Sequence, residues 1–174
     1  MRTKAISKSL PIIGLETKDL LWTTTLTLLA IIAPALLAHT PHNQWITGTI
    51  VNALLFIAAW RLGLANAILV AVLPSSVALM RGLLPAPMAI LIPYIIFSNV
   101  LLILTFSFLK KNLTLGVSIA SFVKFTFLFG VSLYFAPKLL APMIMMLQWS
   151  QLITALAGGF VAAMTISLLK KTTK

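Results

Sequence analysis

The sequence predicts an all-α integral membrane protein, a bundle of six transmembrane helices with both termini in the cytoplasm. Of its 174 residues, 60% are hydrophobic and 9% are charged, whereas roughly a quarter of the residues in a soluble domain are charged. The apolar residues gather in segments of about 20 residues or more, the length at which a helix crosses a bilayer. Short polar and basic stretches separate these segments. Composition and spacing together exclude a soluble globular domain.

Five apolar stretches account for the six expected helices. The run over residues 46–80 is too long for one span, and Arg61, Gly63 and Asn66 interrupt it, so we expect a tight hairpin of two helices there. The N-terminal segment lacks a short apolar core with a small-residue cleavage site, so we expect no removable signal peptide. The expected spans are residues 20–38, the two arms of 46–80, 88–109, 113–135 and 143–169.

Basic residues predict how this transmembrane domain, residues 20–169, is oriented. Ten of the 13 lie on the side of the termini, in segments that include residues 1–19 and 170–174, and only two lie on the other side. The positive-inside rule therefore places both termini in the cytoplasm. We expect the membrane to be the plasma membrane of the cell. The net charge is +11, and the basic residues flank the apolar spans. We therefore interpret the charge as a signal of membrane topology and expect no nucleic-acid partner. The ten are Arg2, Lys4, Lys8, Lys18, Arg61, Lys110, Lys111, Lys170, Lys171 and Lys174, and the two are Arg81 and Lys138.

Lys124 stands near the middle of segment 113–135, which would place its ammonium close to the bilayer centre. A charge at that depth costs roughly 2.5–3.5 kcal/mol on insertion scales, so an intramembrane lysine predicts a functional site. The two acids of the chain, Glu16 and Asp19, precede the first span. We therefore expect one of four arrangements for the lysine. It snorkels to an interface, contacts backbone carbonyls freed by a neighbouring proline, contacts a lipid headgroup, or binds an anionic ligand. An anionic ligand from outside the chain is the hypothesis we carry forward.

Polar and aromatic residues in the spans are further candidates for contact with a small-molecule ligand. Amides, aromatic rings and a cation together are typical of a ligand pocket, although amides also join helices and tryptophans anchor helices at interfaces. Two cations at the expected outer mouth would raise the local concentration of an anion, or contact lipid phosphates. The candidates beside Lys124 are Asn52, Asn99, Gln148, Gln151, Trp149 and Arg81, with Lys138 as a second cation at the mouth.

Catalysis and metal binding find little support in the sequence. The chain has no cysteine, and its two acids form no carboxylate pair within the spans. His39 and His42 form an H-x-x-H pair without a third ligand nearby, so we expect no metal site and no cofactor. A serine–lysine pair of Ser98 with Lys124 remains as an enzymatic alternative. We expect the protein not to be an enzyme.

The stretch ITGTIVNALLFIAAWRLGLANAILVAVLPSSVALMRGLLPAPMAILIPYIIFSN, together with QLITALAGGFVAA, resembles the substrate-binding S components of energy-coupling factor (ECF) transporters, in a subgroup of unknown substrate. The resemblance implies capture of a scarce, vitamin-like nutrient on the outer side. It also implies inward delivery together with a transmembrane coupling subunit and two ATPases. The family's docking face on the first helix has its nearest match here in Ala30, Pro34 and Ala38.

Two other classes of protein compete with the substrate-binding subunit. A small membrane scaffold or assembly protein would use its amides and small residues for subunit contacts and transport nothing. A self-sufficient secondary carrier usually needs a titratable acid or an ion site, and the expected spans contain no acid.

Overall fold

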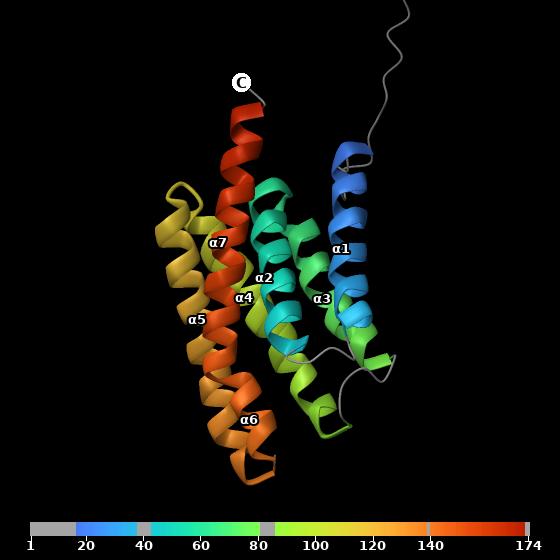
Figure 1. The fold of residues 1–174 in the computed structure, drawn as a ribbon, viewed down its shortest axis with the longest axis vertical. Helices are drawn as coiled ribbons and strands as arrows, with labels where there is room; N and C mark the ends of the chain where they lie inside the picture. Colours follow the sequence, from blue (N-terminus) through green and yellow to red (C-terminus); the bar gives the residue numbers. More distant parts are fainter. Residues whose placement is uncertain (1–16, 38–42, 81–85, 139, 173–174) are drawn as a thin grey trace, which may run out of the picture.

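The computed structural model describes residues 17–37, 43–80, 86–138 and 140–172, and these residues form helices and short connections (Figure 1). Four helices form the first part of the chain and three the second, with a 3₁₀ helix in each part. The elements are α1 Thr17–Leu37, α2 Asn43–Arg61, α3 Leu64–Met80, η1 Ala86–Leu91, α4 Ile92–Leu109, α5 Leu113–Phe135, η2 Ala136–Lys138, α6 Ala141–Leu147 and α7 Trp149–Thr172.

The structure confirms the all-α class and several helix boundaries. Helix α5 spans Leu113–Phe135, the range expected from the sequence, and the side chain of Asn112 caps it by accepting from the amide of Leu115 at 3.1 Å. The long apolar run is divided at Leu62 and Gly63 into α2 and α3, as the interruptions predicted. Helix α1 begins at Thr17, slightly before the expected start.

Two of the expected spans are not single α-helices. The span over residues 88–109 begins in η1, and Pro93 occupies the first turn of α4, where its missing N–H costs nothing. The span over residues 143–169 is wrong as one continuous helix. It consists of α6 and α7, because the backbone of Gln148 leaves the helical region at φ −101° and ψ −120°.

Within the described parts of the chain, four helical stretches are long and apolar enough to cross a membrane. Helix α3 is shorter, and three amide side chains in α2 lower its apolar character. Length and composition therefore establish a helical protein with several membrane-spanning candidates, and six spans remain a proposal. The four stretches are Thr17–Leu37, Ala89–Leu109, Leu113–Lys138 and Ala141–Lys171.

The helices run alternately up and down (Figure 1). The start of α1, the α2–α3 and α4–α5 turns and the end of α7 lie at one end of the bundle, and α6 lies at the other. Phe56 of α2 and Phe106 of α4 are fully buried in the larger core, their ring centroids 5.0 Å apart. A smaller core beside α6 contains Leu91, Leu128 and Leu147.

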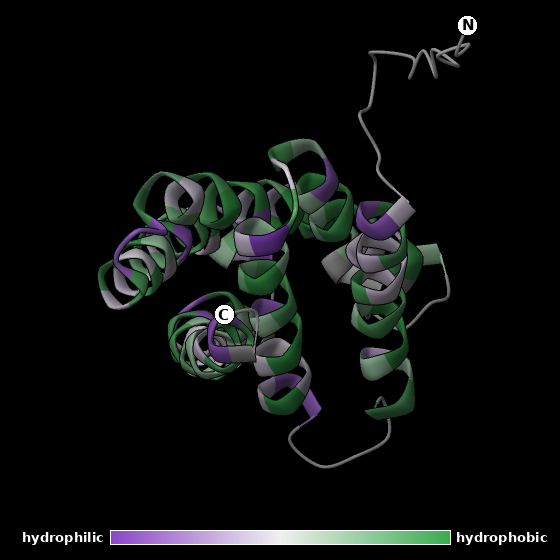
Figure 2. Ribbon diagram, turned by 90° about the horizontal axis from the view of Figure 1, so that it is seen from above, coloured by the Kyte–Doolittle hydropathy of each residue, from purple (hydrophilic) through white to green (hydrophobic). Residues whose placement is uncertain are grey.

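The outer faces of the helices are apolar as well as the inner ones. Leu36, Phe108 and Phe160 are more than two-thirds exposed, and hydrophobic residues prevail around the helices when the bundle is seen from one end (Figure 2). A soluble monomer rarely exposes apolar surface so widely. Hydrocarbon tails of a bilayer are the solvent that suits such a surface.

Helices α2 and α7 approach closely through glycines. A Cβ atom built on Gly158 of α7 would lie 2.5 Å from the carbonyl oxygen of Thr49 and 2.8 Å from the amide nitrogen of Ala53, both in α2. A Cβ atom on Gly48 of α2 would lie 3.1 Å from the side chain of Thr154. Small residues allow such backbone-to-backbone contact within membranes. The contact sets the position of α2, which carries Asn52.

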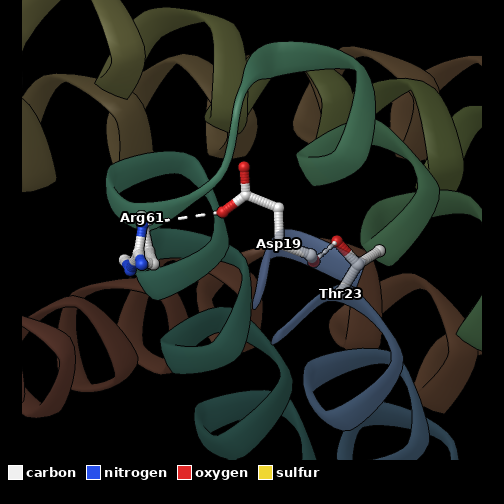
Figure 3. A network of polar contacts seen from close by, with 3 residues as sticks. All are labelled: Asp19, Thr23 and Arg61. Atoms are coloured by element: carbon white, nitrogen blue, oxygen red, sulfur yellow. Dashed lines mark hydrogen bonds and ion pairs between the residues drawn. The ribbon is translucent and has the colours of Figure 1, made fainter. Parts of the chain in front are cut away.

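The start of α1 is joined to the end of α2 by an ion pair. Asp19 lies 3.7 Å from the guanidinium of Arg61, and Thr23 donates to the carbonyl oxygen of Asp19 at 2.7 Å (Figure 3). The guanidinium also lies 6.0 Å from the ring centroid of Trp22. Both charged side chains are partly exposed, and pairs of this kind contribute about 0–1 kcal/mol.

We expect Gly158→Ala to lower the free energy of unfolding by about 1–3 kcal/mol, because the added methyl group meets backbone atoms that cannot move aside. The measurement is unfolding of the purified protein in detergent. Gly130→Ala in α5 is the matched control, since nothing lies within 4 Å of its added Cβ, and it should leave stability unchanged or raise it slightly. Equal stability of the two variants would contradict the close α2–α7 contact.

Candidate functional site

Lys124 lies at the centre of α5, eleven residues from either end of the helix, and only 3% of it is exposed. Its Nζ donates to the Oδ1 atoms of Asn52 and Asn99, both at 2.7 Å. These distances fall in the range of charge-assisted hydrogen bonds, 2.7–2.9 Å, and below the ordinary ~2.9–3.0 Å. One ammonium thus joins three helices, since Asn52 belongs to α2 and Asn99 to α4.

This arrangement corrects the expected partner of the lysine. We expected carbonyls, a lipid headgroup or a ligand, and the structure supplies two side-chain amides of the same chain. Both asparagines had been predicted as ligand contacts, without a link to the lysine. The amides are neutral, so they solvate the positive charge without cancelling it.

Asn52 is held in the orientation that presents its oxygen to the lysine. Its Nδ2 donates to the carbonyl oxygen of Gly48 at 2.8 Å and to the Oγ1 of Thr154 at 3.4 Å. Thr154 in turn donates to the carbonyl oxygen of Ser150 at 2.7 Å. Lysine only donates, so the oxygen of Asn52 must face it. Helix α7 therefore takes part in fixing the ammonium through Thr154.

A cavity of about 200 Å³, here called the Lys124 cavity, adjoins this cluster. It is lined by four of the predicted ligand contacts, four further polar side chains, a glycine and five apolar residues. Its lining comprises Lys124, Asn52, Asn99, Gln151, Gln44, Thr47, Gly48, Ser75, Thr154, Pro34, Val51, Pro74, Ile92 and Ile95.

The polar wall of the Lys124 cavity contains free hydrogen-bond donors at and beside Lys124. Two of the three N–H groups of Lys124 are used, and the Nδ2 of Asn99 has no acceptor among the described residues. No acid compensates them there, because the one described carboxylate, that of Asp19, pairs with Arg61. Chemically, such a wall recognises a ligand that accepts hydrogen bonds and carries negative charge.

Gln148 and Trp149 lie apart from the Lys124 cavity. They line a second cavity of about 380 Å³, the helix-break pocket, beside the junction of α6 and α7. Gln148 donates to the Oγ of Ser132 at 3.1 Å. Trp149 is 62% exposed, its ring centroid 5.1 Å from that of Phe125, which suits an interfacial anchor. The structure therefore separates two predicted contacts from the lysine.

The predicted docking face on α1 is turned toward the chain itself. Ala30 is fully buried in the larger core, and Pro34 lines the Lys124 cavity. The side chain of Ala30 is therefore not available to a partner in this structure, whereas Pro34 is partly exposed, and the docking role stays a prediction. The outward surface of α1 carries Leu29 and Leu36 instead.

Several other predicted residues fall elsewhere. Arg81, Ala38, His39 and His42 lie outside the described residues. Lys138 is exposed at the end of the bundle that carries α6. Among the described residues, no three histidines or acids come together as metal ligands would.

Sequence reasoning missed Gln44, Thr47 and Thr154, although a periodic signal was present. Gln44, Thr47, Gly48, Val51 and Asn52 follow helical spacing, which places them on one face of α2. Extending the polar face of Asn52 and Gly48 backward by one turn would have found Gln44. In the same way, Thr154 lies three residues after Gln151.

Comparison with models of protein families, with curated proteins and with solved structures gives no match for this chain. The class of protein is therefore described from the fold and the candidate site alone. It is a helical protein with membrane-spanning candidates and a buried lysine that borders a partly open cavity.

We expect Asn99→Leu to lower the free energy of unfolding by about 1–3 kcal/mol, because Lys124 loses one of its two acceptors. Adding Lys124→Met should recover part of this loss, since the uncompensated charge is then removed. Denaturation in detergent of the two single variants and the double variant measures the coupling. Strictly additive effects would show that the amide–ammonium contact is not the cause.

Proposed function

We propose that this chain is the substrate-binding membrane subunit of an importer, and that its ligand places an anionic group against Lys124. The single observation that carries the proposal is the buried amine of Lys124. It is held by two neutral amides and borders a cavity without a counter-charge among the described residues.

Energetics favour a ligand over a purely structural role for the charge. Burying an ammonium without an opposite charge costs several kcal/mol even after relaxation. If the residue only joined helices, a neutral glutamine or an apolar side chain would avoid that cost. A carboxylate or phosphate bound in the cavity would supply the missing charge and accept from the free donors of Lys124 and Asn99.

The volume of the Lys124 cavity limits the size of the ligand. Its volume of about 200 Å³ is below the ~300–1,000 Å³ of sites for drug-sized molecules. The apolar wall, which includes Val51, Ile92 and Ile95, suits a small carbon skeleton. We therefore propose a small, vitamin-like acid or phosphate ester.

Delivery of such a ligand needs partners, and the resemblance to ECF S components suggests which ones. We propose that the chain docks on a transmembrane coupling subunit that carries two ATPases. We place the protein in the plasma membrane with six spans and both termini in the cytoplasm. The basic ends of α2 and α7 support this orientation, because they lie at the same end of the bundle (Figure 1).

Lys124→Gln is the variant that tests the ligand. The glutamine still donates hydrogen bonds but carries no charge, so retention of small acids through purification should fall at least tenfold. Mass spectrometry of molecules released from the detergent-purified protein measures the loss. Lys110→Gln removes an exposed lysine at the end of α4, away from the expected mouth, and is the control. Equal amounts of the same acid from both variants would refute the proposal.

The orientation has its own test, because the chain contains no cysteine. Lys138→Cys should react with a membrane-impermeant thiol reagent on intact cells. Lys171→Cys, at the end of α7, should react only after the membrane is opened. The reverse pattern would place the termini outside and would move the α6 end to the cytoplasm.

A further inference from the structure

The Lys124 cavity has a second polar region, whose side chains have hydrogen-bond acceptors to offer and few donors left. It consists of Gln44 and Thr47 on α2 and Gln151 on α7, and all three residues line the cavity and are partly exposed. We call these three residues the acceptor region. Their character follows from the hydrogen bonds that they already make within the chain.

The amide of Gln44 is oriented by groups outside the cavity lining. Its Nε2 donates to the carbonyl oxygen of Met146 and to the Oγ of Ser150, both at 3.2 Å, which uses both of its N–H groups. A backbone carbonyl only accepts, so the nitrogen of the amide must be the atom next to Met146. The Oε1 of Gln44 accepts from no donor among the described residues. This oxygen is therefore what the side chain can offer a ligand.

Thr47 and Gln151 have their donors engaged in the same way. The Oγ1 of Thr47 donates its proton to the carbonyl oxygen of Asn43 at 2.7 Å, so toward a ligand it can only accept. The Nε2 of Gln151 donates to the carbonyl oxygen of Met146 at 3.0 Å, which fixes the orientation of the amide and leaves its Oε1 to accept. One N–H of Gln151 also stays free. Acceptors thus prevail in this region, whereas free donors prevail at Lys124.

The acceptor region is separated from Lys124 along the helices. Asn52 accepts from the Nζ of Lys124 and marks the depth of the amine. It follows Thr47 by five residues and Gln44 by eight, which is about 7 and 12 Å along the axis of α2. Helices α2 and α7 both start at the end of the bundle near α6 (Figure 1), so Gln151 lies on the same side of the lysine as Gln44.

We infer that the ligand is a small monoanion that also carries a neutral hydrogen-bond donor, a hydroxyl or an amide N–H, about 7–12 Å from its acidic group. The acid binds at Lys124 and the Nδ2 of Asn99, and the donor binds at the oxygens of the acceptor region. The inference rests on the proposed function for the anion and adds the second group of the ligand.

The charges of the cavity lining decide that the second group is neutral. The lining has one basic side chain, Lys124, and no acid. One negative charge on the ligand therefore balances the site. A second negative charge would meet amide and hydroxyl oxygens, and a positive charge would find no carboxylate, so either would be desolvated without a counter-charge.

The test measures the dissociation constants of three six-carbon acids for the full-length protein in detergent by titration calorimetry. 6-Hydroxyhexanoate carries an acid and a donor, 6-methoxyhexanoate has an oxygen that only accepts, and adipate carries a second acid. 6-Hydroxyhexanoate should bind at least fivefold tighter than either of the others. A smaller preference, or no binding of 6-hydroxyhexanoate at millimolar concentration, overturns the inference.

Variants locate the preference in the acceptor region. Gln44→Met keeps the volume of the side chain but removes the amide, so it should reduce the preference for 6-hydroxyhexanoate over 6-methoxyhexanoate to less than twofold. The carbonyl oxygen of Met146 keeps two other donors, so the variant should fold, and Gln151→Met is the second variant. Gln148→Met makes the same change in the helix-break pocket, outside the lining of the Lys124 cavity, and should keep the full preference. A preference that survives both Gln44→Met and Gln151→Met overturns the inference.

Lys124→Gln separates this inference from the proposed function. The variant should weaken the binding of all three acids at least tenfold, because each places a carboxylate against the lysine. Unchanged affinities in Lys124→Gln contradict the proposed function. Equal affinities for 6-hydroxyhexanoate and 6-methoxyhexanoate that both still depend on Lys124 contradict only the inferred donor.

Discussion

The structure depends on the need to solvate one positive charge inside an apolar bundle. Lys124 sits at the centre of α5, and its Nζ can be satisfied only if acceptors reach the same depth from neighbouring helices. Asn52 and Asn99 do so at 2.7 Å each. This requirement fixes the relative height of α2, α4 and α5. The close contact of Gly158 with the backbone of α2 holds the first of the two asparagines in place.

Neutral acceptors give this cluster a different character from an ion pair. A carboxylate partner would cancel the charge and leave the cavity with no electrostatic preference. Two amide oxygens lower the cost of burial while the field of the ammonium still reaches the cavity. Asn52 is itself oriented by Gly48 and Thr154, so its oxygen cannot turn away. The donors are thus arranged before any ligand arrives, which reduces the entropy that binding has to overcome.

Sequence periodicity predicted the bounds of single helices but did not predict the side-chain contacts between helices. The bounds of α5 and the turn at Leu62 and Gly63 follow from apolar length and its interruptions. The pairing of Lys124 with Asn52 could not be predicted, because spacing gives the face of each helix but not the rotation and height of one helix relative to another. The break at Gln148 has no proline or glycine beside it, and its carbonyls are satisfied by side chains, one of them 102 residues away. Helix α2 is not among the four stretches that are long and apolar enough to cross a membrane, because its amides, which also build the site, reduce its apolar character.

The hydrogen bonds of Lys124 and those of Gln44 differ in length and in burial. The contacts that hold the ammonium are short and buried, and removing either leaves a charge less solvated. The contacts of Gln44 are longer and duplicate donors that Met146 already has. Helix α2 carries one residue of each kind, Gln44 and Asn52, two helical turns apart, so a single helix joins the amine of Lys124 to the junction of α6 and α7.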